Sequence, residues 1–290
     1  MAQTAVHLIV LFDTLFIVGL VSLAAIVLTA WLSPTIRRSS TWFMFIWSWL
    51  LISIANIILV GQQTGTEPMA GICLFQAMLV YGLPVLSSFY AVTFTLQVYL
   101  TIQGAMQGRS TMSKKQLIGI HALPIVSCVG VFIEVLVIGL SSPDTVARDD
   151  TGMICHLTSS FPRRLTAGIT ILAMVLFIFF GFLLFRIVRR RQDAFLEISG
   201  PGTKAYLSGD VVIRVLVFSC CPTFALAISG LKYLSSSHDK DATSNLILAG
   251  LPLVASFIFG SQKDILRVWT SFIPRQGMDP DVKEIKPATA

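Results

Sequence analysis

A long stretch without any charged side chain, residues 68–108, constrains this chain more than any other feature of its sequence. Residues 71–102 alone would form a helix of roughly 45 Å, whereas the hydrocarbon core of a membrane is about 30 Å thick. A helix of that length has to tilt, and a tilted helix contacts many neighbours, so we expect it to be the central helix of a bundle. Its polar side chains should face other helices, because each would be costly against lipid. They are Ser87, Ser88, Thr93, Thr95 and Gln97.

The composition of the chain is that of an integral membrane protein. Hydrophobic residues make up 54% of the sequence and charged residues only 12%, with a mean hydropathy of +0.79. A soluble domain of this composition would expose large apolar patches to water, which excludes that class. The formal charge of +6 lies in short clusters, so it predicts membrane topology and not a nucleic-acid-binding surface. Among the five cysteines, no spacing typical of a metal site occurs.

Seven apolar segments separated by charged residues are close to or above the length needed to cross a membrane. They comprise residues 7–32, 42–60, 71–102, 116–140, 166–188, 212–231 and 245–260. The predicted fold is an all-α integral membrane bundle of seven transmembrane helices. It forms one domain over residues 1–273, because no loop has the size of a separate soluble domain. Residues 274–290 are polar and contain proline, so we expect a disordered tail.

Basic residues in the loops predict the orientation of the chain. The first, third and fifth loops carry ten lysines and arginines, whereas the second, fourth and sixth carry five. Loops rich in lysine and arginine stay in the cytosol, so the N-terminus is expected outside and the C-terminal tail in the cytoplasm. The expected location is the plasma membrane.

A short amphipathic helix is predicted at residues 262–273, after the seventh span. Its apolar residues recur at intervals of one, three and four positions, with Lys263 and Asp264 on the other side. The apolar set is Ile265, Leu266, Trp269, Phe272 and Ile273. We expect this helix to lie along the inner leaflet; the alternative is a cytosolic extension of the seventh helix.

Two of the five cysteines are predicted to face the oxidising side of the membrane. Cys73 lies at the outer end of the third helix and Cys155 in the long fourth loop. A cysteine pair in that compartment is a candidate disulfide, and two free cysteines are the alternative. The other three, Cys128, Cys220 and Cys221, fall within predicted helices, where cysteine usually acts as a small packing residue.

Seven spans, an outside N-terminus and the two outer cysteines together resemble the G-protein-coupled receptor architecture. The third helix ends Gln97-Val98-Tyr99-Leu100 without Asp-Arg-Tyr, and the seventh contains Gly250-Leu251-Pro252 without Asn-Pro-x-x-Tyr. The animal rhodopsin-like family is therefore a poor match.

The short termini, the proline in Ser219-Cys220-Cys221-Pro222 and the junction at residues 259–266 look most like fungal receptor-like proteins of mushroom-forming species. These proteins are distantly similar to the fungal mating-pheromone receptors. The resemblance implies a receptor and not an enzyme. It implies no cofactor, an extracellular ligand, and a heterotrimeric G protein as the partner inside the cell.

Two carboxylates and one amide are predicted inside the membrane. Asp13 and Glu134 each lie roughly 9 Å below the outer surface by helical rise, and Asn56 has a similar depth. Ionisable groups within a membrane are functional candidates, and the alternative is that each is hydrated or hydrogen-bonded to a neighbouring helix. We expect Asp13 to contact Asn56.

Pro222 interrupts the backbone hydrogen bonds of the sixth predicted helix, which makes it a candidate hinge. A swing about this hinge would open a cleft at the cytoplasmic end, between the third and fifth helices. Arg214 lies four residues after Asp210 on one helical face, either as a solvated pair or as a latch for that swing. The predicted G-protein face comprises Tyr99, Arg189, Arg190, Arg191, Arg214 and Lys263.

A ligand pocket is expected between the outer halves of helices three, five, six and seven. Depth in the membrane selects its polar residues, which are Tyr81, Ser87, Thr170, Thr223 and Asn245. The alternative function is a small-solute transporter or channel, with Asp13, Asn56 and Glu134 along its pathway. A retinal protein would need a lysine in the seventh span for its Schiff base, and residues 245–260 contain none.

Overall fold

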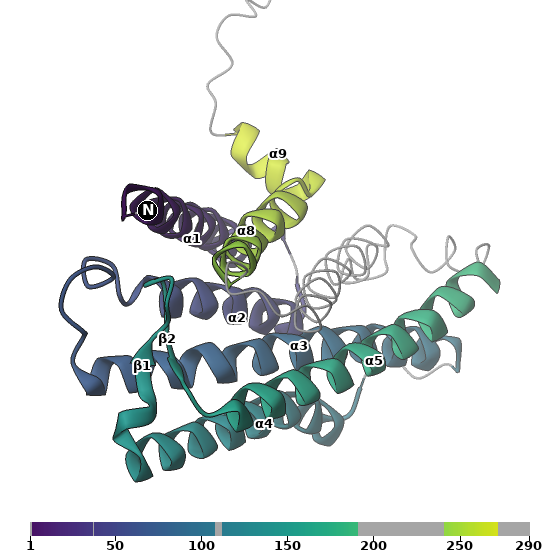
Figure 1. The fold of residues 1–290 in the computed structure, drawn as a ribbon. Helices are drawn as coiled ribbons and strands as arrows, with labels where there is room; N and C mark the ends of the chain where they lie inside the picture. Colours follow the sequence, from purple (N-terminus) through teal and green to yellow (C-terminus); the bar gives the residue numbers. More distant parts are fainter. Residues whose placement is uncertain (1, 37, 108–111, 191–240, 272–290) are drawn as a thin grey trace, which may run out of the picture.

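The structure is a computed structural model that describes residues 2–36, 38–107, 112–190 and 241–271. Within these residues the chain forms a bundle of long helices with one small β-hairpin (Figure 1). The helices are α1 (Ala2–Leu32), α2 (Ser40–Ile57), α3 (Ala70–Met106), α4 (Lys114–Ser141), α5 (Ser160–Arg190), α8 (Asp241–Gly260) and α9 (Lys263–Ser271). The strands are β1 (Val146–Arg148) and β2 (Cys155–Leu157).

Six of the described helices, α1 to α5 and α8, are long and apolar enough to cross a membrane. Their outward faces carry large apolar side chains that lipid can cover, among them Val126 on α4 and Phe182 on α5. The chain is therefore a multi-pass membrane protein. The six helices correspond to six of the seven predicted spans, and the remaining one, residues 212–231, lies outside the described residues.

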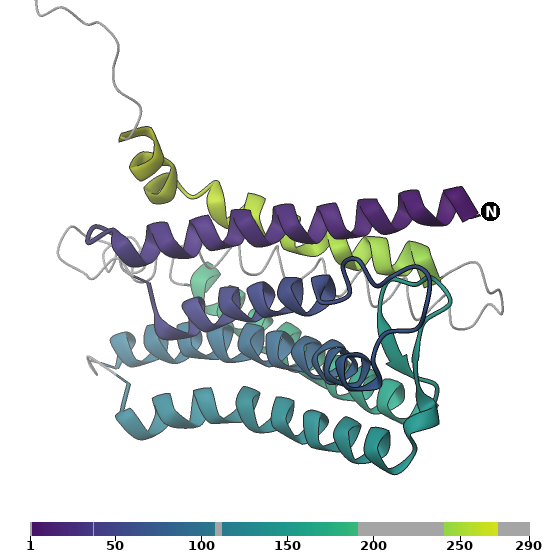
Figure 2. The same cartoon turned by 90° about the vertical axis from the view of Figure 1, so that its left-hand side faces the viewer.

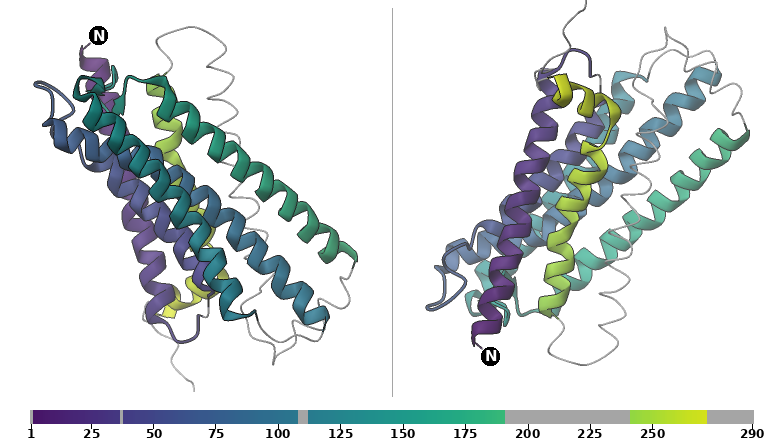
Figure 3. Two further views of the ribbon diagram at one scale, coloured as in Figure 1. Left: turned by 90° about the horizontal axis from the view of Figure 1, so that it is seen from below. Right: turned by 90° about the horizontal axis from the view of Figure 1, so that it is seen from above.

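Helix α3 is the central helix of the described bundle. It contacts α2, α4, α5 and both strands, and Figure 3 shows α4 and α5 running alongside it. Its polar side chains point into the protein, as predicted. Ser87, Ser88, Thr93 and Thr95 are buried. The half-buried Gln97 accepts a hydrogen bond from Thr41 of α2, so this polar group is satisfied by another helix and not by lipid.

Polar caps explain why several helices begin earlier than their apolar runs. Ser39 accepts a hydrogen bond from the amide of Trp42 at 3.3 Å, so α2 begins at Ser40 and not at residue 42. Ser113 and Gln116 form a reciprocal capping box that begins α4 at Lys114. Helix α5 begins six residues before the predicted position, with Pro162 in its first turn, where a missing amide hydrogen costs little.

A two-stranded antiparallel sheet corrects the all-α prediction. It pairs Val146 with Leu157 and Arg148 with Cys155, within a segment that the sequence had assigned to a loop. The turn between the strands holds Gly152 at φ +77°, a conformation that suits glycine. Figure 2 shows this hairpin at the same end of the bundle as the N-terminus, with α9 at the opposite end.

Helix α8 packs along α1 and joins the first two helices to the C-terminal part of the chain. A side chain at Gly19 of α1 would place its Cβ 2.7 Å from the Cβ of Pro252, so glycine allows the two helices to approach closely. Phe259 of α8 meets the rings of Trp42 and Phe45 edge to face, with centroids 6.2 and 6.0 Å apart.

Helix α9 folds back against the end of α1. Ile265 is fully buried, whereas Leu266 is exposed, so only part of the predicted apolar face meets the protein. The indole of Trp269 donates a hydrogen bond of 2.8 Å to the hydroxyl of Thr29 on α1. The described helix Lys263–Ser271 is shorter than the predicted one, since Phe272 and Ile273 lie outside the described residues, and it contacts the bundle near both of its ends.

Candidate functional site

The hairpin is anchored to the N-terminal end of α3 by a disulfide between Cys73 and Cys155, which confirms the predicted pair. Their Cα atoms are 5.3 Å apart, within the usual range for a disulfide. The buried amide of Gln76, three residues further along α3, makes a second connection. It accepts from the Cys155 amide at 2.9 Å and donates to the Ala55 carbonyl of α2 at 3.0 Å.

Sequence reasoning did not identify Gln76. A signal for it exists, because a glutamine three positions after Cys73 lies on the same face of a helix that carries no charge. The oxygen and the nitrogen of this buried side-chain amide each have a hydrogen-bond partner, as buried polar groups usually do.

The loop between α2 and α3, residues 58–69, packs against the hairpin, and together we call them the outer lid, after the side of the membrane on which the sequence predicts them. The Arg148 guanidinium donates to the carbonyls of Gln62 at 2.8 Å and Gly65 at 3.1 Å. A Cβ on Gly152 would lie 2.7 Å from the Gln63 carbonyl oxygen, so the two parts are in close backbone contact. The Gln63 side chain in turn donates to Asp13 of α1 at 2.7 Å.

The tip of the hairpin also reaches α8. The side-chain amide of Asn245 donates to Asp149 at 3.3 Å and to the Thr151 hydroxyl at 3.4 Å. Thr151 donates to Asp149 at 2.5 Å, so the three side chains form one small network. The outer lid is therefore connected to α1, α2, α3 and α8.

A cavity of about 140 Å³ lies among the helices, with the hairpin residue Ile154 in its wall. Its described lining is mainly aliphatic and aromatic and contains no charged side chain. The aromatic residues are Phe12, Phe16, Phe45 and Trp49, and the polar ones are Asn56, Ser87, Ser88, Thr170 and Asn245.

Three of the five predicted pocket residues line this cavity: Ser87, Thr170 and Asn245. Tyr81 does not, and its side chain is buried in the main hydrophobic core. Thr223 lies outside the described residues. Helices α1 and α2 contribute to the walls, although the predicted pocket did not include them.

Most polar groups of the cavity are satisfied by their own helices. Ser87 and Ser88 donate to the Pro84 carbonyl at 3.1 and 2.7 Å, and Asn56 donates to the Ile52 carbonyl at 2.8 Å. Thr170 differs. It is 4% exposed, and its hydroxyl has no hydrogen-bond partner among the described residues.

The three predicted intramembrane polar residues do not come together. Asp13 accepts from Gln63 of the outer lid and not from Asn56, whose amide bonds within α2. The expected Asp13–Asn56 contact is therefore wrong, because a long side chain from the loop reaches Asp13. Glu134 on α4 does not line the cavity, and both of its carboxyl oxygens are buried without a hydrogen-bond partner in the described part of the chain.

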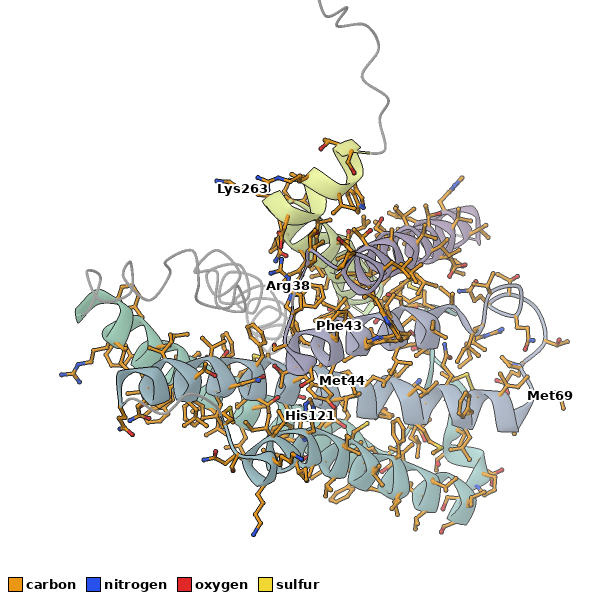
Figure 4. The ribbon with its side chains drawn as sticks, turned by 180° about the vertical axis from the view of Figure 1, so that it is seen from behind. Arg38, Phe43, Met44, Met69, His121 and Lys263 are labelled. Carbon is orange, nitrogen blue, oxygen red and sulfur yellow. A yellow bond between two sulfur atoms is a disulfide. The ribbon has the colours of Figure 1, made fainter. Side chains whose placement is uncertain are left out.

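At the opposite end of the bundle, Arg38 connects the α1–α2 loop to the α8–α9 junction. Its side chain is 4% exposed, forms an ion pair with Asp264 and donates to the Gln262 side chain at 2.6 Å. The guanidinium also lies 5.6 Å from the ring centroid of Trp42. Burial lowers the pKa of the Arg38 guanidinium, and the charge of Asp264 opposes that shift. Figure 4 shows Arg38 beneath α9, with Lys263 pointing away from the bundle.

The predicted G-protein face is described only in part. Tyr99 is half-buried on α3, Lys263 is exposed at the start of α9, and Arg189 and Arg190 are the last two residues of α5. Arg191, Arg214 and the predicted hinge Pro222 lie outside the described residues.

No protein-family model matches the chain, and no similar sequence was found among curated proteins. Within residues 2–36, 38–107, 112–190 and 241–271, no group of three or more histidine, cysteine, aspartate or glutamate residues could hold a metal ion. The candidate site is therefore identified from the positions and contacts of the described residues.

Proposed function

We propose that this chain is a seven-transmembrane receptor of the G-protein-coupled type, similar to the receptor-like proteins of mushroom-forming fungi. It passes the signal of an extracellular ligand to a heterotrimeric G protein at the plasma membrane. The observation that carries this proposal is an apolar cavity inside the bundle whose wall includes a disulfide-anchored hairpin. A concave, mainly apolar site with a few polar groups is typical of small-ligand pockets.

The described contacts offer a route from the cavity to the other end of the bundle. Asn245 lines the cavity and holds the hairpin tip, and it belongs to the first turns of α8. Near the other end of the same helix, Phe259 contacts aromatic rings of α2. The junction that follows the helix is hydrogen-bonded to Arg38. A ligand shifts the equilibrium between two conformations of the protein only if it binds one of them more tightly. The ligand therefore has to contact α8 differently in the two conformations.

Two described chain ends support the predicted sixth span, residues 212–231. Helix α5 begins just after the hairpin and runs away from it, while α8 begins beside the hairpin through Asn245. We propose that the sixth span lies in the part of the chain between Arg190 and Asp241, which is outside the described residues. With that span, α9 becomes the eighth helix, which we place along the inner leaflet.

The orientation in the membrane has two independent supports. Disulfides persist on the oxidising side, and the Cys73–Cys155 bridge lies at the same end as the N-terminus (Figure 2). The lysines and arginines that favour the cytosol are concentrated in the loops of the other side. We therefore orient the N-terminus outside and the tail in the cytoplasm.

Nucleotide-dependent binding of a G-protein α subunit tests this function. The purified chain in lipid nanodiscs should retain at least one α subunit of the source organism without nucleotide and release it with a non-hydrolysable GTP analogue. Replacing Arg189, Arg190 and Arg191 together by alanine should weaken retention, because each basic residue near an anionic inner leaflet contributes about 1 kcal/mol of attraction. The control is Arg148→Ala in the outer lid, which should leave retention unchanged.

Failure to retain any α subunit, or retention that ignores nucleotide, would overturn the receptor proposal. The transporter alternative predicts solute flux across proteoliposomes containing the chain. The described structure gives it less support, because Asp13, Asn56 and Glu134 do not form one polar path.

A further inference from the structure

We infer that the cavity binds a small, uncharged, mainly apolar molecule about the size of one aromatic ring, whose single oxygen function accepts a hydrogen bond from Thr170. This inference rests on the proposed receptor function for its biological meaning, since it names the ligand class of the same cavity. Size, charge and hydrogen bonding each contribute to it separately.

Size sets the first limit. The cavity measures about 140 Å³. Apolar cavities of about 150 Å³ inside proteins stay dry and take up benzene or xenon. The cavity therefore fits a molecule of about six to nine heavy atoms, and a longer chain or a folded peptide would exceed it.

Charge sets the second limit. None of the described lining residues is ionisable, and two carboxylates at the outer lid, Asp13 and Asp149, are already hydrogen-bonded to Gln63, Thr151 and Asn245. An ionised ligand would lose its hydration without gaining a partner of opposite charge, which is very unfavourable in an apolar site. The ligand is accordingly neutral.

Hydrogen bonding sets the orientation. Ser87, Ser88 and Asn56 already donate to carbonyls of their own helices, whereas the Thr170 hydroxyl is buried, lines the cavity and has no partner among the described residues. A buried hydroxyl without a partner lacks the hydrogen bond that water would give it. An alcohol, aldehyde or ketone oxygen on the ligand supplies that missing acceptor.

The chain contains a matched control for Thr170. Thr166 lies one turn earlier on α5, and its hydroxyl is likewise buried without a hydrogen-bond partner in the described residues, but it does not line the cavity. Replacing either threonine by valine removes the same hydroxyl from the same helix at nearly constant volume. Only Thr170→Val should affect the ligand.

The test uses 4-fluorobenzyl alcohol and ¹⁹F NMR with the full chain in lipid nanodiscs, in the absence of any G protein. Saturable binding is expected, and partition into the lipid is measured with empty nanodiscs. Thr170→Val should weaken binding about tenfold, Thr166→Val should not change it, and Ala91→Phe, which fills the cavity, should abolish it. Ala55→Leu replaces Ala91→Phe if the latter fails to fold. The charged analogue 4-fluorobenzylammonium, which has as many heavy atoms as the alcohol, should not bind.

No saturable binding to the wild-type chain, or equal affinity of Thr170→Val and Thr166→Val, would overturn the inference. The two proposals fail separately. Nucleotide-dependent retention of an α subunit without binding of the fluorinated alcohol would leave the receptor and remove this ligand class. Binding of the alcohol without any retention of an α subunit would leave the cavity assignment and remove the receptor.

Discussion

At the scale of single residues, Gln76 shows how a polar side chain stabilises a protein whose interior is apolar. Replacing it by leucine would leave the Cys155 amide and the Ala55 carbonyl without their buried partners. The expected loss is about 1–3 kcal/mol of unfolding free energy for each such group, measured as a lower thermal stability in nanodiscs. Gln107→Leu, at an exposed position after α3, should change stability little. Equal stability of both variants would show that the Gln76 amide is dispensable.

Two glycines of the outer lid separate backbone strain from steric contact. Gly65 and Gly152 both have positive φ, +88° and +77°, but only at Gly152 would a Cβ meet backbone, 2.7 Å from the Gln63 oxygen. We expect Gly65→Ala to cost about 1–2 kcal/mol for the left-handed conformation alone. Gly152→Ala should cost at least about 1 kcal/mol more, because the lid has to shift. Equal melting temperatures would argue against the tight packing of the lid.

At the scale of elements, Asn245 connects the hairpin to α8 through two long hydrogen bonds. In Asn245→Ala the hairpin tip loses this attachment but keeps the disulfide, so residues 149–154 should exchange amide hydrogens roughly two- to tenfold faster, as expected from about 0.5–1.5 kcal/mol per hydrogen bond. Asn56→Ala is the control, because that amide also lines the cavity but bonds within its own helix. If amide hydrogen exchange of residues 149–154 is unchanged in Asn245→Ala, α8 does not belong to the proposed route from the cavity to the other end of the bundle.

The lengths of the apolar runs in the sequence predict most of the described helices. Each described span overlaps its predicted range, and two of the differences arise where Ser39 and Ser113 extend a helix by capping it. The hairpin was missed because its strands have three residues each, too short for any periodicity. Depth along the helices correctly selected Ser87, Thr170 and Asn245 as cavity residues.

Apart from the Cys73–Cys155 pair, the contacts between distant parts of the chain were not predicted from the sequence. Gln76 meets a partner 79 residues away, and Arg38 meets one 226 residues away. Spacing within a helix says which residues share a face, but not which helix covers that face. Arg38 was therefore counted only as a charge of the first loop, and its burial beneath α9 emerges from the fold.

At the scale of the whole molecule, the ion pair of Arg38 and Asp264 fastens the first loop to the last described helix, at the end opposite the outer lid. The Arg38 side chain is 4% exposed and that of Asp264 43%, so the guanidinium depends on its partner more than the carboxylate does. Asp264→Asn would leave a buried charge without compensation. Because one partner is half-exposed, the expected loss is about 1–3 kcal/mol, below the roughly 3–5 kcal/mol of a fully buried pair.

A double-mutant cycle separates this pair from general damage. In an Arg38→Met background the buried charge is absent, so adding Asp264→Asn should cost little more, and the two changes should couple by about 1–3 kcal/mol. The same cycle with Asp144→Asn, an exposed carboxylate of the outer loop, should give additive effects. Additive effects of Arg38→Met and Asp264→Asn would mean that α9 is held by Ile265 and by the Trp269–Thr29 bond alone. Coupling would mean that the charge pair also sets the position of α9, and with it the surface offered to a G protein.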